Sequence, residues 1–372
     1  MKSRKRVGII GYSGTIGRKV IDYLKNDYKI RGGSRHLNES ELDIELMKVD
    51  TEDEKSLEQF CDGCDLVINC AGPSFLIGDK IVKCAANKGV SYIDAFGANL
   101  LENKINESKY KNDIVTVISA GVFPGFSAML VKWLANKFDK VENLVAYFGG
   151  QERCSWSATM DLLLSTKYNF GVANAEYCNG EIVKNASING DSTELPGVPQ
   201  KVYLQKFLSS ESIRIANELK IGKLEWYSII SDKLIYDNLT EAYSKIVYEE
   251  DIDKISDIAD NLANISSMFA NGGDNWYRIV IDVLGECNGI TNTKRLVIEN
   301  EDSSKISAIV ISKVAKNLLE KNHNLGVYWA DEILNQDDVT EILDDKSIIN
   351  SYQFVDVLSS SKEIDCYEEG VL

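Results

Sequence analysis

The chain has 372 residues, enough for two domains with separate cores, and its 44% apolar and 26% charged content is typical of a globular protein. The formal net charge of −16 argues against a nucleic-acid partner, because phosphate contacts require clustered Lys and Arg. No apolar segment reaches the roughly 20 residues that cross a bilayer, so we expect no membrane partner.

The N-terminal stretch RVGIIGYSGTIGRKVIDYL, residues 6–24, predicts a dinucleotide-binding site. Residues 7–10 are typical of a buried parallel strand, and an amphipathic helix follows the glycines. Gly11 permits the turn, Gly14 lets the backbone approach a pyrophosphate, and Gly17 lets the helix lie close to the sheet. The first N–H groups of the helix would then face the phosphates. The cofactor contacts expected on this turn are Gly11, Ser13, Gly14, Thr15 and Ile16.

The end of the second expected strand distinguishes the two nicotinamide cofactors. NAD-binding domains place Asp or Glu there, where it bonds the ribose 2′-OH. This chain instead has RGGSRH at residues 31–36, with no carboxylate before Glu39. A guanidinium pairs with a 2′-phosphate and a serine hydroxyl completes the site, so we predict NADP(H) bound by Ser34 and Arg35. The alternative for Arg35 is a solvated loop residue, and His36 faces either the phosphate or solvent.

Alternating strand and helix signals continue to residue 138 and predict βαβ units with a right-handed, doubly wound parallel sheet. The expected strands are 28–32, 45–49, 65–69, 91–94 and 114–119, and the expected helices are 54–60, 77–87, 100–110 and one from residue 126. Small residues that follow the strand 65–69 leave room for the dinucleotide, and Pro124 suits the entry to the helix from residue 126. Free N–H groups at 122–125 can hold the nicotinamide carboxamide or a substrate carboxylate. The cofactor contacts expected in these two segments are Ala71, Gly72, Pro73, Gly121 and Pro124.

The pattern changes near residue 140, where a second, α+β domain begins. It is expected to hold a strand at 144–148, helices at 211–219, 240–248 and 252–269, and a hairpin of strands 277–284 and 293–298 around Asn288-Gly289. The fold class is therefore α/β, with an N-terminal Rossmann domain and a second α+β domain. The expected division is 1–125 for the NADP-binding domain, 126–300 for the substrate or oligomerisation domain, 301–358 for C-terminal helices returning to the Rossmann domain, and 359–372 for a weakly ordered tail.

Asp94 and Tyr92 are the candidate catalytic residues. The cofactor supplies hydride, so the protein must orient the substrate and supply a proton. With only two histidines in the chain, other titratable side chains become the candidates. Alternation places Asp94 and Tyr92 on one face at the carboxyl end of the strand 91–94, where either can donate a proton. The alternative is that Asp94 caps the next helix and Tyr92 belongs to the core.

Arg153, Cys154 and Lys167 are the candidate substrate residues, because they follow the first strand of the second domain and flank a predicted helix, 156–164. Arg153 can bind a carboxylate, or it is a surface arginine. Cys154 is either a proton donor or a packed cysteine. No metal is expected. The spacing of Cys61 and Cys64 is that of redox motifs, but the eight cysteines are typical of reduced core and loop residues in a cytosolic protein.

Taken together, these motifs resemble those of the saccharopine dehydrogenase-like (saccharopine reductase) family. The matching segments are GYSGTIG (11–17), DLVINCAGPSF (65–75), SYIDAFG (91–97), SAGVFPGFSAML (119–130) and the Gly149-Gly150 pair. The resemblance implies an NADP(H)-linked Rossmann domain joined to an α+β domain, with substrate between them. It also implies an NADPH-dependent reductase acting on an imine or a related unsaturated bond of a small, carboxylate-bearing metabolite in a biosynthetic pathway.

Two other functions are compatible with the sequence. One is an enoyl or carbonyl reductase that tailors a natural product, and the other is a non-catalytic NADP(H)-sensing or binding protein. The basic opening MKSRKR is followed by a glycine-punctuated strand without a small-residue cleavage site, so we expect a cytoplasmic protein. A small-molecule substrate is the expected partner. The oligomeric state, a homodimer included, stays open.

Overall fold

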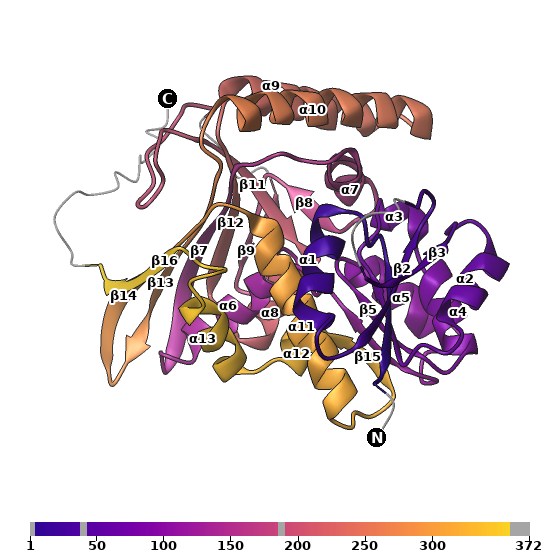
Figure 1. Ribbon diagram of the computed structural model, residues 1–372. Helices are drawn as coiled ribbons and strands as arrows, with labels where there is room; N and C mark the ends of the chain where they lie inside the picture. Colours follow the sequence, from indigo (N-terminus) through magenta and orange to yellow (C-terminus); the bar gives the residue numbers. More distant parts are fainter. Residues whose placement is uncertain (1–3, 38–42, 185–189, 358–372) are drawn as a thin grey trace.

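The computed structural model describes residues 4–37, 43–184 and 190–357, so the expected tail at 359–372 lies outside the described residues. It has two β-sheets with helices between and around them, as Figure 1 shows. One sheet is parallel and of the Rossmann type, and the other is mixed, so the predicted α/β fold class is confirmed. Within the described ranges, no helix combines the length and the apolar character that a membrane span requires.

The first sheet has seven parallel strands in the order β15-β6-β5-β4-β1-β2-β3. Their bounds are β1 Arg6–Ile10, β2 Lys29–Ser34, β3 Glu45–Lys48, β4 Leu66–Asn69, β5 Ser91–Asp94, β6 Val115–Ile118 and β15 Gly326–Trp329. Strand β1 is buried on both faces, because Ile9 packs into one core cluster and Ile10 into the other. The strand order reverses between β1 and β4. The carboxyl ends of these two strands therefore form the switch point at which dinucleotides bind.

Helices cover both faces of this sheet. Those of the first domain are α1 Thr15–Leu24, α2 Glu54–Cys61, α3 Ser74–Ile77, α4 Lys80–Asn87, α5 Ala98–Glu107 and α6 Phe126–Ala135. Helix α1 lies beside α11, Ser303–Glu320, in Figure 1, and α2 packs against α4. Because α1 and α2 contribute to different core clusters, the sheet is doubly wound, as the alternating sequence pattern predicts.

The second sheet has the strand order β10-β9-β12-β7-β13-β14-β16, with β11 paired to β12 and β8 paired to β11. The strands are β7 Lys140–Gln151, β8 Gly171–Ala173, β9 Ala175–Cys178, β10 Glu181–Lys184, β11 Tyr203–Ser209, β12 Lys223–Ile230, β13 Trp276–Cys287, β14 Ile290–Asn300 and β16 Ser351–Asp356. Its helices are α7 Trp156–Lys167, α8 Ser210–Glu218, α9 Lys233–Ile246 and α10 Ile252–Gly272. The β13–β14 hairpin turns at Asn288 and Gly289, both with positive φ, as the Asn-Gly signal predicts.

The C-terminal segment connects both sheets. Helix α11 lies beside α1 and β15 pairs with β6, whereas β16 pairs with β14 of the second sheet. Short helices α12, Ala330–Ile333, and α13, Gln336–Asp344, lie between these strands in the sequence. The expected run of helices at 301–358 therefore also contains two strands, of which one belongs to each sheet.

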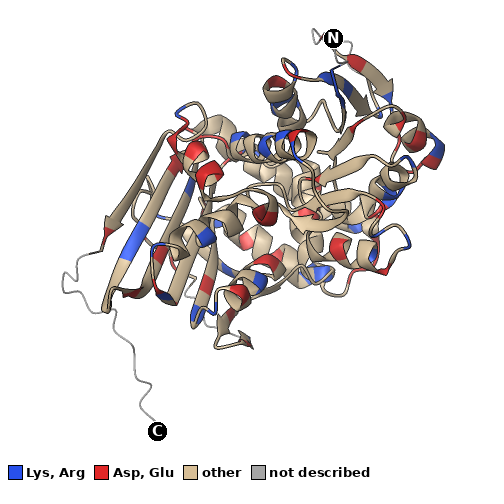
Figure 2. Cartoon of the chain, turned by 90° about the horizontal axis from the view of Figure 1, so that it is seen from below, with Lys and Arg blue, Asp and Glu red and all other residues tan. Residues whose placement is uncertain are grey.

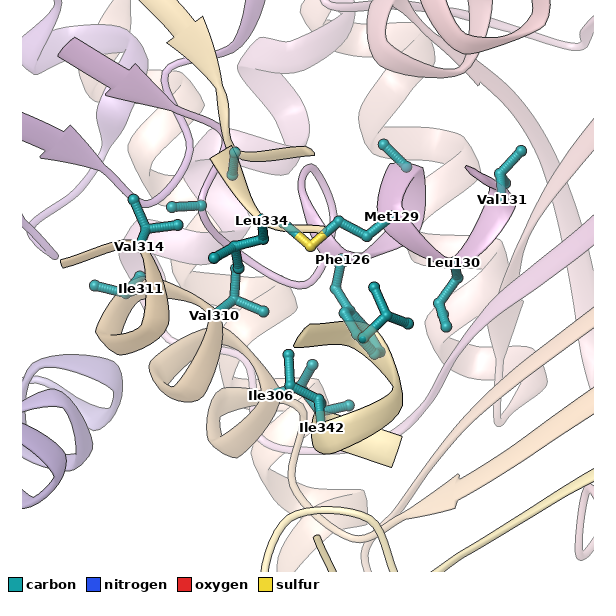
Figure 3. Packing of buried hydrophobic residues seen from close by; sticks show 14 of the residues in the cluster. Phe126, Met129, Leu130, Val131, Ile306, Val310, Ile311, Val314, Leu334 and Ile342 are labelled. Atoms are coloured by element: carbon teal, nitrogen blue, oxygen red, sulfur yellow. The ribbon is translucent and has the colours of Figure 1, made fainter. Parts of the chain in front are cut away.

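One hydrophobic core joins the two sheets. Figure 3 shows residues of α6, α11 and α13 packed together, among them Phe126, Met129, Ile306, Val310 and Ile342. The same cluster includes Ile9 of β1 and Ala146 of β7, both fully buried. Because this core is continuous, the carboxyl edge of the first sheet is held against the second domain.

Candidate cofactor and substrate site

The three glycines of the β1–α1 turn have different surroundings. Gly11 has φ +82°, and a Cβ there would lie 2.6 Å from the backbone nitrogen of Ala71. A Cβ on Gly17 would lie 2.3 Å from the carbonyl oxygen of Gly11. A Cβ on Gly14 would meet only that same oxygen, at 3.3 Å, because Gly14 is exposed. The turn therefore leaves space for a pyrophosphate above Gly14, as its spacing predicts.

The start of α1 is the anion-binding element of this turn. Gly14 is the N-cap residue of α1, and Thr15 is exposed, while Ser13 and Ile16 are half-buried. The first N–H groups of a helix have no partner within the helix and lie at its positive end. Figure 2 shows Lys and Arg interspersed with Asp and Glu over the described elements. Since the net charge is −16, phosphates must be bound by local features such as this helix start.

At the end of β2, two closely packed glycines are followed by residues that are increasingly exposed to solvent. A Cβ on Gly32 would lie 2.7 Å from the Tyr12 ring, and one on Gly33 would lie 2.7 Å from the Phe60 ring. Ser34 is half-buried and Arg35 is exposed directly after it. Both predicted 2′-phosphate contacts thus stand at the carboxyl end of β2, on the side where the adenosine half of a dinucleotide binds. Glu39 lies outside the described residues.

Arg31 has a structural role. Its Nε donates to Glu45 at 2.9 Å, and its guanidinium donates to the carbonyl oxygens of Phe60 and Asp62, both at 2.7 Å. The side chain therefore ties β2 to β3 and to the end of α2. Arg35 is the guanidinium left at this end of β2 for a 2′-phosphate.

The turns after β4 and β6 lie on the other side of the switch point. Asn69 accepts a hydrogen bond from the backbone of Ala71 at 3.0 Å, and Gly72 lies against α7, where its Cβ would be 3.2 Å from Asp161. After β6, the backbone N–H of Gly121 donates to the carbonyl of Pro124 at 3.1 Å. The predicted contacts Ala71, Gly72, Pro73, Gly121 and Pro124 are thus all placed at the carboxyl edge of the sheet.

The backbone N–H groups in the turn after β6 are less available than the sequence suggests. The N–H of Val122 donates to Ser307 of α11 at 3.1 Å, and that of Gly125 donates to Glu211 of α8 at 2.7 Å. We expected free N–H groups at 122–125 to hold the nicotinamide carboxamide or a substrate carboxylate. This expectation fails for Val122 and Gly125, because side chains from distant helices already accept their hydrogen bonds.

Asp94 and Tyr92 do lie together, as alternation predicts, but neither faces solvent. The Tyr92 hydroxyl donates to Asp94 at 2.5 Å, and Asn69 and the Phe96 backbone donate to the same carboxylate at 3.0 and 2.9 Å. Tyr92 is fully buried and Asp94 is 2% exposed. Burial raises the pKa of Asp94 above its usual value, although these three donors act against that rise. Asp94 therefore joins β4, β5 and the turn that follows β5.

Two carboxylates of the second domain reach this edge, and sequence reasoning missed both. Asp161 of α7 accepts from the backbone N–H groups of Ser74 and Phe75 at 2.9 and 3.2 Å, and so caps α3. Glu211 of α8 accepts from Gly125 and also from the Ser127 hydroxyl, at 2.5 Å, at the start of α6. Burial is the largest cause that raises the pKa of each carboxyl to about 7. No local signal reveals these contacts, because their partners are 84 to 87 residues away.

Aromatic side chains close the contact between the domains. Phe96 and Phe123 come from the turns after β5 and β6, and Phe75 lies in α3, which follows the turn after β4. Phe75 stacks on Tyr168 with ring centroids 5.6 Å apart, and Phe123 stacks on Trp226 at 5.5 Å. Phe96 contacts Phe170 at 5.0 Å. We call these three phenylalanines and their second-domain partners the aromatic seam. The segments that follow β4, β5 and β6 thus each contribute one phenylalanine to the seam.

The predicted substrate residues are not all brought together. Arg153 and Cys154 are exposed on the loop between β7 and α7, near the end of β7. Lys167 is the last residue of α7, where its ammonium group donates to the carbonyl of Glu249. Because α7 rises about 1.5 Å per residue over its 12 residues, Lys167 lies at the opposite end of that helix from Arg153. Only Arg153 and Cys154 remain as neighbouring candidates.

Comparisons with known proteins agree with this geometry. Residues 7–117 match the family model of the saccharopine dehydrogenase NADP binding domain. A "Lipid droplet localized protein" of Caenorhabditis elegans is 29% identical over 184 residues, which are 42% of this chain and 43% of that protein. A "Probable mitochondrial saccharopine dehydrogenase-like oxidoreductase" of Arabidopsis thaliana is 35% identical over 54 residues, 14% of this chain and 12% of that protein. The chain thus spans less than half the length of either curated relative.

A solved structure matches over almost the whole chain. The apo saccharopine dehydrogenase (L-Glu forming) of Saccharomyces cerevisiae has a TM-score of 0.65 and 15% identity, and the match covers 94% of this chain and all of that one. The fold and the glycine turn define a two-domain protein with an NADP-binding Rossmann domain. Within residues 7–117 the chain matches the saccharopine dehydrogenase NADP binding domain, which confirms the resemblance that the motifs of this segment indicate. NADP(H) is the cofactor that this domain implies, and the open space at Gly14 and the exposed Arg35 fit it.

Proposed function

We propose that this protein is an NADPH-dependent oxidoreductase that transfers hydride to an imine, or to a related unsaturated bond, in a small metabolite that carries a carboxylate. The observation that carries the proposal is the placement of the NADP-binding turn at the switch point of a sheet whose carboxyl edge is packed against a second domain. Ligands of open α/β sheets bind at this edge, so a substrate held there meets the nicotinamide end of the cofactor.

The chain's own residues would bind and orient the cofactor, which supplies hydride when bound. The N–H groups of Thr15 and Ile16 would bind the pyrophosphate, and Ser34 with Arg35 would bind the 2′-phosphate. The ring contacts of the aromatic seam would limit the access of water beside the turns after β4 and β6, where the nicotinamide half would lie.

Arg153 and Cys154 are the side chains that we propose for the substrate. Both are exposed on one loop at the end of β7, where a guanidinium can bind a carboxylate in a bidentate manner. The Cys154 thiol is the neighbouring group that can donate a proton. For Asp94 and Tyr92 we propose a positioning role, since the carboxylate accepts three hydrogen bonds and both side chains are buried.

The experiment is a survey of NADPH oxidation with pairs of amines and 2-keto acids, alongside 2-enoic acids and simple ketones. Turnover with an amine and keto-acid pair, but with neither partner alone, supports imine reduction. Turnover with an enoic acid or a ketone alone supports the enoyl or carbonyl reductase instead. Arg153→Ala should raise KM for the carboxylate substrate about 10-fold or more, because the variant loses a charge-assisted contact.

A second function, non-catalytic NADP(H) binding, is favoured by one observation. The carboxylates placed at the carboxyl edge, Asp94, Asp161 and Glu211, are all buried or capped by hydrogen bonds, so none of them is presented to a substrate. NADPH binding without turnover in any pair of the survey supports this function. Turnover that disappears in the Arg153→Ala variant argues against it.

A further inference from the structure

Two turns of the first domain would flank the nicotinamide half of the cofactor. In a doubly wound sheet, the pyrophosphate lies at the start of α1, and the two halves of the dinucleotide lie on opposite sides of the switch point. The adenosine half lies toward β2, where Ser34 and Arg35 stand. The nicotinamide half therefore lies toward β4, β5 and β6. The turns 71–75 and 121–127 close β4 and β6 on that side.

Each of these turns is held by a carboxylate of the second domain, half-buried in the case of Asp161 and buried in the case of Glu211. Asp161 lies 87 positions after Ser74 and 86 after Phe75, and each of its two carboxylate oxygens accepts one of their backbone N–H groups. Glu211 is 1% exposed and bonds Gly125 and Ser127 at the other turn. A carboxylate at a helix start is also favoured by the helix dipole, which applies to Glu211 at the 10-residue helix α6.

The backbone around both contacts is closely packed, so each turn depends on its carboxylate for its position. A Cβ on Gly72 would lie 3.2 Å from Asp161 and 3.3 Å from Ser157, one turn earlier on α7. Gly125 has φ +129°, and its Cβ would lie 2.4 Å from the carbonyl oxygen of Ser119. If either carboxylate were lost, its N–H donors would lose their acceptor, and those of the buried Phe75 and Gly125 would reach water only if the turn moved.

We propose that Asp161 and Glu211 are positioning residues for the nicotinamide half of the cofactor, because they fix the two turns between which that half binds. The inference rests on the proposed cofactor site and extends it to the second domain. It means that the nucleotide site is complete only when the two domains are packed together. The adenosine half, by contrast, is bound by the first domain alone.

Replacing each carboxylate by the amide of the same shape has different effects on the Asp161 and Glu211 contacts. Both partners of Asp161 are backbone N–H groups, so an Asn can accept from one of them and opposes the other with its own NH₂. The partners of Glu211 are one N–H group and one hydroxyl, and a hydroxyl can also accept. Glu211→Gln therefore preserves both hydrogen bonds, whereas Asp161→Asn loses one. Glu211→Ala loses both.

The test measures the affinity of NADPH and of adenosine 2′,5′-bisphosphate, which contains only the adenosine half, for the full chain and its variants. Asp161→Asn and Glu211→Ala should each weaken NADPH binding about 10-fold or more and leave the bisphosphate within about twofold. Glu211→Gln should bind both ligands like the parent. Glu320→Gln is the control, because Glu320 accepts from Tyr28 at the C-terminal end of α11, close to the beginning of β2 and the opposite edge of the sheet.

Two results would overturn the inference. One is unchanged NADPH affinity in both Asp161→Asn and Glu211→Ala. The other is an equal loss of both ligands in these variants, which would mark a general loss of folding. If one of the two variants fails to bind the bisphosphate, the NADPH affinity of the other variant tests the inference. A parent chain that binds neither ligand would overturn the proposed cofactor site together with this inference, whereas bisphosphate binding with unchanged NADPH affinity in the variants would overturn only the inference.

Discussion

Tyr92 donates its hydroxyl to Asp94 across 2.5 Å, inside a core where neither side chain is more than 2% exposed. Asn69 and the backbone of Phe96 donate to the same carboxylate. Burial raises the pKa of both side chains, that of Tyr92 well above its usual value. The pair therefore holds the ends of β4 and β5 together at the edge where the cofactor would lie.

The Asp94→Asn variant should lose stability and not cofactor selectivity. An amide opposes one of the three donors with its own NH₂, which should lower the free energy of unfolding by about 1–3 kcal/mol. Chemical denaturation measures this change, and titration with NADPH measures the binding of the folded fraction. Unchanged stability together with a large loss of turnover would instead assign Asp94 a direct part in proton transfer.

Arg35→Ala should reduce NADPH affinity by about 1–3 kcal/mol and leave NADH affinity nearly unchanged, because only NADPH has the 2′-phosphate. Fluorescence titration with both cofactors measures the difference. Lys29→Ala is a matched control, since Lys29 is an exposed cation at the other end of the same strand. Equal losses for NADPH and NADH in Arg35→Ala would remove Arg35 from the phosphate site.

Gly14 and Gly17 should respond differently to an added side chain. Gly14→Val should fold like the parent, since Gly14 has ordinary extended backbone angles and open space, but should not bind NADPH. Gly17→Ala should be destabilised, because its Cβ would lie 2.3 Å from the Gly11 carbonyl oxygen. For both variants, the melting temperature measures stability and titration with NADPH measures binding. Parent-like NADPH affinity in Gly14→Val would place the dinucleotide elsewhere.

How much the sequence could predict depended on how local each contact is. The strand, glycine turn and helix at 6–24 are defined by neighbouring residues, and so is the Asn288-Gly289 hairpin. Strand β12 was not predicted, although Leu224 and Trp226 alternate with partly exposed residues, because its parallel partner β7 lies about 80 positions earlier. Glu211 lies in the first turn of α8, where an acidic residue ordinarily stabilises its own helix. Its contact with α6 depends on the packing of the two domains.

Stability should decrease as the pH rises toward neutrality because of three carboxyls, of which Glu211 is buried and Glu152 and Asp161 are half-buried. Burial is the main cause that raises the pKa of Glu152, Asp161 and Glu211 to about 7. Nearby charges add smaller effects. For Glu152, Asp302 raises the pKa and Lys19 lowers it. Asp94 raises the pKa of Asp161, whereas for Glu211 Asp331 raises the pKa and Arg214 lowers it. Between their unfolded pKa values, near 4, and about pH 7, the folded chain holds protons that the unfolded chain has released. These groups therefore lower the free energy of unfolding as the pH rises through this window.

Glu211→Gln isolates one of these contributions. The variant keeps both hydrogen bonds but cannot titrate, so its free energy of unfolding should fall less steeply than that of the parent between about pH 5 and about pH 7. The difference between the two curves should be at most roughly 3 kcal/mol. Denaturant titrations at several pH values measure it. Parallel curves would show that Glu211 does not hold a proton in the folded chain.

The structure of the chain with bound NADPH tests the central claim most directly. The account predicts the 2′-phosphate at Ser34 and Arg35, the pyrophosphate over Gly14 at the start of α1, and the nicotinamide between the turns 71–75 and 121–127. A dinucleotide bound away from the carboxyl edge of the first sheet, or bound with its adenosine half toward β4 and β6, would contradict it.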